Sequence, residues 1–89
     1  MKEYFTKEEY EKIEQLTHDA LNAINKKEAQ RYINQLQFCG YSLSGRANNI
    51  FNELVCYVID ASGRVDNKEK RVSSVKSKLY DLKSYGVKE

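Results

Sequence analysis

The side chains able to act as a nucleophile or a metal ligand are few and far apart in this sequence. The chain of 89 residues has one histidine, His18, and two cysteines, Cys39 and Cys56. A cysteine nucleophile needs a nearby base, and zinc sites use several histidine or cysteine ligands. His18 and its neighbour Asp19 would point in different directions on a helix. We therefore predict no catalytic residues, no cofactor and no metal, and both cysteines reduced.

A glycine pattern in the middle of the chain suggests phosphate chemistry. Gly40 and Gly45 have the spacing of the glycines in a Walker-type phosphate-binding loop, G-x-x-x-x-G-K-[ST]. Arg46 and Ala47 follow, where that motif has a lysine and the hydroxyl that holds magnesium. The run before the first glycine, residues 31–36, has a helical pattern and not that of a buried strand. The sequence therefore does not predict a nucleotide-hydrolysing loop.

The same stretch also suggests a DNA-binding motif. Residues 40–44, Gly-Tyr-Ser-Leu-Ser, resemble the turn and the start of the recognition helix in many bacterial helix-turn-helix domains. Such domains place apolar side chains where this chain has Arg46 and Asn49. A DNA-binding regulator with a degenerate helix-turn-helix at residues 36–55 is therefore an alternative. The residues that would read DNA are Ser44, Arg46, Asn48 and Asn49.

Capping patterns mark the helices that must position these side chains. An acceptor followed three residues later by glutamate occurs at Thr6 and Glu9, at Asn25 and Glu28, and at Asp66 and Glu69. Such pairs are typical of helix N-termini. Apolar residues follow each start at spacings of three and four. We predict an all-α chain of three helices, at about residues 7–24, 26–62 and 67–85.

The central helix allows two interpretations, a continuous helix or a broken one. Apolar and small residues recur from Ala29 to Ala61 without a change of phase across Gly40 and Gly45, and the chain has no proline. This favours one long helix, with a kink allowed at the glycines, although each interior glycine costs about 1 kcal/mol. The alternative is a break at residues 40–45, which gives a compact four-helix bundle. In both cases residues 1–89 form a single helical domain.

The length of the predicted central helix suggests self-association. About 36 residues would extend roughly 54 Å, about twice the length of either flanking helix. The flanking helices would leave part of its apolar stripe uncovered. We therefore predict a homo-oligomer, with Gly40 and Ser44 allowing close approach of helices at the seam.

Charge and hydropathy limit the partners. The net charge is +2, but residues 64–89 carry eight basic and four acidic side chains, which favours an acidic partner. No apolar run is long enough to span a membrane, and the N-terminal residues lack a signal-peptide pattern. We therefore expect no membrane partner and a cytoplasmic location, in the host cytoplasm if the protein is viral. Basic residues near residue 68 form a candidate anion-binding corner: Arg64, Lys68, Lys70 and Arg71.

The seven tyrosines point to contact with other molecules, because tyrosine gives a large contact area at a low entropic cost. We predict a non-enzymatic binding protein, of the kind common among phage and mobile-element accessory products, that inhibits or sequesters a host protein. The alternatives are the DNA-binding regulator and an oligomeric binder of a small anionic nucleotide, held by Arg46, Arg64 or Arg71. The candidate contact residues are Tyr41, Arg46, Tyr57, Arg64, Lys68, Arg71 and Tyr80.

Overall fold

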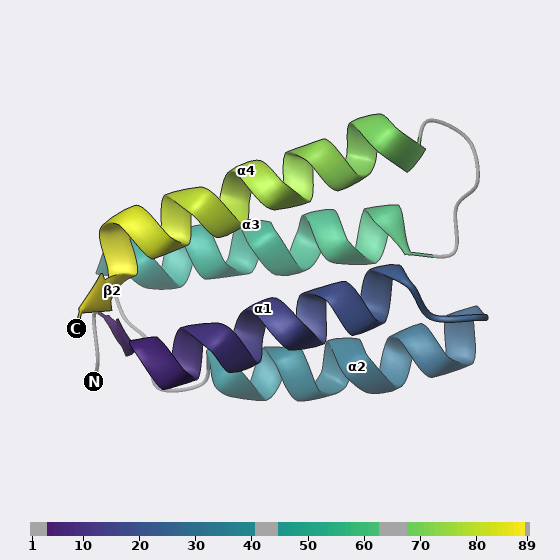
Figure 1. Ribbon diagram of the computed structural model, residues 1–89, viewed down its shortest axis with the longest axis horizontal. Coiled ribbons are helices and arrows are strands. Elements are labelled where there is room, and N and C mark those ends of the chain that lie inside the picture. Colours follow the sequence, from purple (N-terminus) through teal and green to yellow (C-terminus); the bar gives the residue numbers. More distant parts are fainter. Residues whose placement is uncertain (1–3, 41–44, 63–67, 89) are drawn as a thin grey trace.

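Four helices, each running opposite to the one before it, make up most of the chain (Figure 1). The computed structural model describes residues 4–40, 45–62 and 68–88. The helices are α1 (Lys7–Leu21), α2 (Lys26–Cys39), α3 (Gly45–Ala61) and α4 (Lys68–Gly86). Two short strands, β1 (Phe5–Thr6) and β2 (Val87–Lys88), precede α1 and follow α4 and pair in parallel. The prediction of an all-α chain is confirmed.

The prediction of one continuous central helix is wrong, and the alternative of a four-helix bundle fits the structure. The run predicted as residues 26–62 is divided into α2 and α3. Folding back allows Leu36 of α2 and Leu54 of α3 to enter one core. Gly40 and Ala47 lie seven residues apart, which is about two helical turns. The apolar spacing in the sequence is therefore the same as in an unbroken helix.

A close contact at the end of α2 explains one of the two central glycines. Gly40 caps α2 with φ −95° and ψ 1°, a conformation that residues with a side chain can also adopt. Its hydrogen faces the ring of Phe51 on α3, and a Cβ built there would lie 2.2 Å from the Phe51 Cε2. Glycine is therefore required at this position by the approach of α3.

The first two helices begin as the sequence predicts. Thr6 and Glu9 form a complete capping box, in which each side chain bonds the other's backbone N–H. The Asn25 side chain accepts from the backbone N–H of Glu28 at 2.8 Å. The predicted end of the first helix at residue 24 is wrong, because α1 ends at Leu21. Ile24, the last residue of the predicted helix, is instead 89% exposed between α1 and α2.

The bundle consists of two helical hairpins, α1 with α2 and α3 with α4, which enclose one core (Figure 1). The hydroxyl of buried Tyr10 on α1 donates to the carbonyl oxygen of Leu79 on α4 at 3.1 Å. At the end of the bundle that holds both strands, the ring of Phe5 packs 6.0 Å from that of Phe51. These contacts tie each hairpin to the other.

Candidate functional site

A regular series of side-chain pairs joins α3 to α4, and we call it the α3/α4 seam. Its three pairs are Arg46 with Tyr85, Glu53 with Lys78, and Asp60 with Arg71. Successive pairs are seven residues apart on both helices, as expected when two antiparallel helices pack with a heptad period. Two of the pairs are ion pairs, and the third is a cation over an aromatic ring. Within the seam, Arg46 is therefore the charged residue whose partner is a ring and not an opposite charge.

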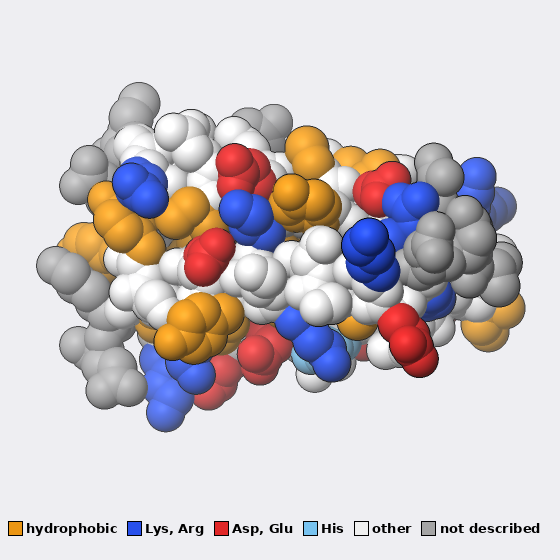
Figure 2. Space-filling model, turned by 90° about the horizontal axis from the view of Figure 1, so that it is seen from above, with side chains coloured by type: hydrophobic (Ala, Val, Ile, Leu, Met, Phe, Trp, Pro, Cys, Tyr) orange, Lys and Arg blue, Asp and Glu red, His pale blue; other side chains and the backbone are white. Residues whose placement is uncertain are grey.

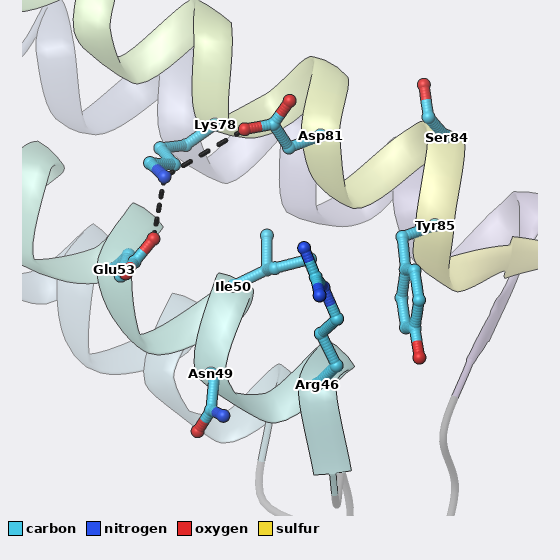
Figure 3. Close-up of a pocket in the computed structure, with 8 residues that line it drawn as sticks. All are labelled: Arg46, Asn49, Ile50, Glu53, Lys78, Asp81, Ser84 and Tyr85. Carbon is cyan, nitrogen blue, oxygen red and sulfur yellow. Dashed lines mark ion pairs between the residues drawn. The ribbon is translucent and has the colours of Figure 1, made fainter.

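In the middle pair of the seam, the positive charge of Lys78 is offset by acidic residues of the protein itself. The Lys78 Nζ lies 2.6 Å from a Glu53 carboxylate oxygen and 3.9 Å from one of Asp81 (Figure 3). The hydrogen bond to Glu53 is the largest cause that raises the pKa of Lys78. Lys78 therefore remains charged and turned toward α3, and its charge is offset by acidic neighbours.

Arg46 lies at the end of the seam nearest the start of α3. We call this the open end, because its pair contains no acidic residue. The Arg46 guanidinium carbon is 5.6 Å from the centre of the Tyr85 ring, within range of a cation–π interaction. Among the residues that the structure describes, Arg46 makes no ion pair. Its side chain extends into a hollow of about 550 Å³ between α3 and α4 (Figure 3). We call this the Arg46 hollow, and its walls include Asn49, Ser84 and Tyr85.

The hollow has opposite electrostatic character at its two ends. Arg46 provides a cation at one end, while Glu53 and Asp81 surround Lys78 at the other. The Arg46 guanidinium lies beside the Tyr85 ring and carries N–H donors in a planar fork. This geometry suits a carboxylate or a phosphate that enters from outside.

The predicted contact tyrosines and Arg64 lie in different places. Tyr57 is 40% exposed on α3 and makes the smallest of the contributions that raise the pKa of Lys78, so it lies near the middle pair of the seam. Tyr80 is 69% exposed but lies two residues after Lys78, which turns it toward the other side of α4. Tyr41 and Arg64 lie outside the described residues.

In the predicted anion-binding corner, Lys68 and Arg71 contact other residues of the bundle. The Lys68 Nζ donates to the carbonyl oxygen of Leu21 at 3.2 Å and so links the start of α4 to the end of α1. Arg71 forms an ion pair with Asp60, although its Nε is buried without a hydrogen-bond partner among the described residues. Both cations therefore stabilise the bundle.

The basic character of the C-terminal helix does not produce a uniform basic surface. Figure 2 shows acidic and basic side chains interspersed with apolar ones on the face seen from above. This agrees with the ion pairs of Lys78 and Arg71 with acidic residues of α3. A phosphate backbone would therefore meet mixed charges on this face.

The residues proposed to read DNA do not share a surface. Arg46 and Asn49 line the hollow between α3 and α4, whereas Asn48 lines a groove on the opposite flank of α3. Ser44 lies outside the described residues. In addition, α2 and α3 run roughly antiparallel to each other (Figure 1), whereas the two helices of a helix-turn-helix cross steeply. The DNA-binding alternative therefore gains no support from this arrangement.

A second surface, which the sequence did not indicate, is the groove between α2 and α3. It encloses about 730 Å³ over Phe51 and Val55, and exposed Phe38 and Ile59 contribute to its edges. Four carboxamide side chains also line it: Asn34, Gln37, Asn48 and Asn52. None of the described residues that line this groove is charged. The pattern that could have revealed it in the sequence is the series of asparagines and glutamines at helical spacing beside the apolar stripe.

The residues considered for catalysis, His18, Cys39 and Cys56, lie on three different helices. Burial raises the pKa of the Cys39 thiol, which disfavours the nucleophilic thiolate. His18 is exposed on α1, and Cys56 is exposed on α3. Within the described ranges there is no group of three or more potential metal ligands. No helix in these ranges is long and apolar enough to cross a membrane.

Comparisons with protein-family models, with curated proteins and with solved structures give no match.

Proposed function

We propose that this chain is a non-enzymatic binding protein that contacts an acidic protein partner through the α3/α4 seam. The observation that carries this proposal is the pair of Arg46 and Tyr85 at the open end of the seam. Arginine and tyrosine are enriched among the residues that dominate binding energy at protein interfaces. Here both are exposed and border one hollow.

The seam itself indicates what the partner should supply. At two of its pairs, a carboxylate from α3 neutralises a cation from α4. At the third, α3 supplies the cation Arg46 and α4 supplies a ring. An aspartate or glutamate from a partner would complete this pair with a bidentate hydrogen bond. Tyr57, further along the seam, would add apolar contact area.

By occupying such a partner, the protein would block or sequester it, which would be the role of a phage or mobile-element accessory protein that acts on a host factor. The test is quantitative affinity capture from cells of the source organism with wild-type protein and with Arg46→Ala and Tyr85→Ala. We expect at least one captured protein to be lost with both variants and retained with the control Glu11→Ala, which alters an exposed residue of α1. The same captured set with all four proteins would contradict the proposal.

A small anionic nucleotide is the second candidate ligand for the same hollow. Its volume of about 550 Å³ lies within the range of small-molecule sites, and Arg46 is a natural phosphate ligand. Arg71, named with it from the sequence, is instead paired with Asp60 at the far end of the seam. A thermal shift of several degrees with one nucleotide, absent in Arg46→Ala, would favour this candidate over a protein partner.

A further inference from the structure

We propose that the α2/α3 groove is a self-association surface, occupied by a second copy of this chain in a two-fold symmetric dimer. This surface lies on the opposite flank of α3 from the Arg46 hollow. The proposal is therefore independent of the proposed function. It also does not depend on a long central helix, which the structure excludes.

The charge pattern of the groove favours a second copy over a different protein. In a two-fold interface the same patch meets itself, so a charge close to the symmetry axis faces its own copy. The described lining of this groove has no charge, although charged residues are 31% of the whole chain. Electrostatic steering of a foreign partner would need charges here. An uncharged patch avoids self-repulsion.

The polar side chains of the groove are self-complementary. A carboxamide carries both donors and an acceptor, so it can pair with the same group on a second copy. Asn34 comes from α2 and Asn52 from α3, on opposite walls of the groove. Two copies related by a two-fold axis can therefore satisfy these groups mutually.

The apolar side chains supply both projections and a recess. Ile59 is 47% exposed and Phe38 is 71% exposed, while the floor is formed by buried Phe51 and Val55. A separate hollow near the start of α2 is bordered by Ile33 and Ile59 but also by the charged residues Lys26 and Asp60, so the uncharged patch is limited to the α2/α3 groove. Each copy can thus place edge residues over the floor of the other.

The size of the patch predicts a weak dimer. The 14 residues of α2 rise about 21 Å, and two packed helices present a face roughly 20 Å wide. The total area buried by two such faces is near the lower limit of about 1,000 Å² for stable interfaces. We therefore expect a dimer that dissociates on dilution.

Sedimentation equilibrium across a concentration series tests the proposal. We expect the mass to rise from that of the 10.4 kDa chain toward twice that value. Asn52→Lys, which puts a charge in the groove, should remain a monomer at concentrations where wild type is a dimer. The matched control is Asn49→Lys, three residues earlier on α3 and in the other hollow, which should still dimerise. A monomeric wild type, or equal effects of both variants, would overturn the proposal.

A second measurement locates the interface. Cys56 is exposed and lines the groove, so in a Cys39→Ser background its alkylation by a maleimide reports access to that surface. Its rate should fall several-fold as protein concentration rises through the dimerisation range. In the same background Asn52→Lys should abolish this dependence. A dimer in which Cys56 reacts equally fast at all concentrations would place the contact elsewhere and overturn the proposal.

Discussion

At the residue scale, the absence of a side chain on Gly40 permits Phe51 of α3 to pack against the end of α2. Its backbone conformation is open to any residue, so the requirement is steric. Phe51 occupies the space that a methyl group would need. The sequence showed a glycine here but not its neighbour, because a contact between two helices is invisible to helical periodicity.

Gly40→Ala should lower the free energy of unfolding by about 1–3 kcal/mol, the usual cost of overpacking. The measurement is urea unfolding followed by circular dichroism. Asn22→Ala is the control for a change at a helix C-cap, because Asn22 caps α1 with nearly the same backbone angles, φ −100° and ψ 6°. Its own cost is the exposed hydrogen bond that the Asn22 side chain donates to the His18 carbonyl oxygen at 2.9 Å. The double variant Gly40→Ala/Phe51→Leu should be more stable than the sum of the two single changes predicts. Additive effects would contradict the contact.

A second residue-scale prediction concerns Tyr10 at alkaline pH. Its hydroxyl donates to the Leu79 carbonyl oxygen, and burial, followed by the charge of Glu14, raises its pKa above the ordinary 10.0. A raised pKa means that the folded state holds the proton more tightly than the unfolded state. This contribution is therefore full below pH 10.0 and is lost as the pH rises through the folded pKa.

Tyr10→Phe should cost about 1 kcal/mol near neutral pH, because a hydrogen bond is lost. Its stability should then fall less steeply than that of wild type above pH 10. Urea unfolding from pH 7 to pH 11 measures both effects. The difference between the two proteins is the relevant quantity, since Lys78, whose pKa is also raised, titrates in the same alkaline range in both. Parallel pH profiles would contradict this role for Tyr10.

At the element scale, capping was predictable and pairing between helices was not. The starts of α1 and α2 followed from local pairs of residues three apart, whose interaction needs no knowledge of the rest of the fold. The predicted cap at Asp66 lies outside the described residues. The α3/α4 seam joins residues 11 to 39 positions apart, and its heptad spacing has meaning only once the two helices are known to be antiparallel.

The seam predicts a charge-swap result for Asp60 and Arg71. Arg71→Asp places two carboxylates opposite each other and should lower the free energy of unfolding by about 0.5–1 kcal/mol, since the pair is partly exposed. The double variant Asp60→Arg/Arg71→Asp should recover most of this loss. Thermal and urea unfolding provide the measurement, with Glu11→Lys on α1 as the control for a charge change away from the seam.

Salt provides a further check on the same variants. The difference between Arg71→Asp and the double variant should shrink at 1 M salt, because exposed charges are then screened over about 3 Å. A double variant as unstable as the sum of its two single changes would show that Asp60 and Arg71 act independently.

At the scale of the whole molecule, the decisive event is the reversal of the chain between α2 and α3. The sequence carried both possibilities, since the apolar stripe continues in phase and only the glycines argued for a break. Packing favours the reversal: a straight helix would leave its stripe uncovered, whereas the bundle buries Leu36, Leu54 and Val58 completely. The longest extent of the molecule is 35 Å, shorter than the roughly 54 Å of the continuous helix.

The α2/α3 groove and the shared core both require this reversal, so the separation between the start of α2 and the end of α3 is the most direct test. Lys26 and Ser62 border one hollow in the bundle. In a cysteine-free background, spin labels at Lys26→Cys and Ser62→Cys, with dipolar spectroscopy on dilute protein, report their separation. The account predicts a single short separation, with the labelled side chains close to each other. A separation of about 54 Å, as in one unbroken helix, would contradict it.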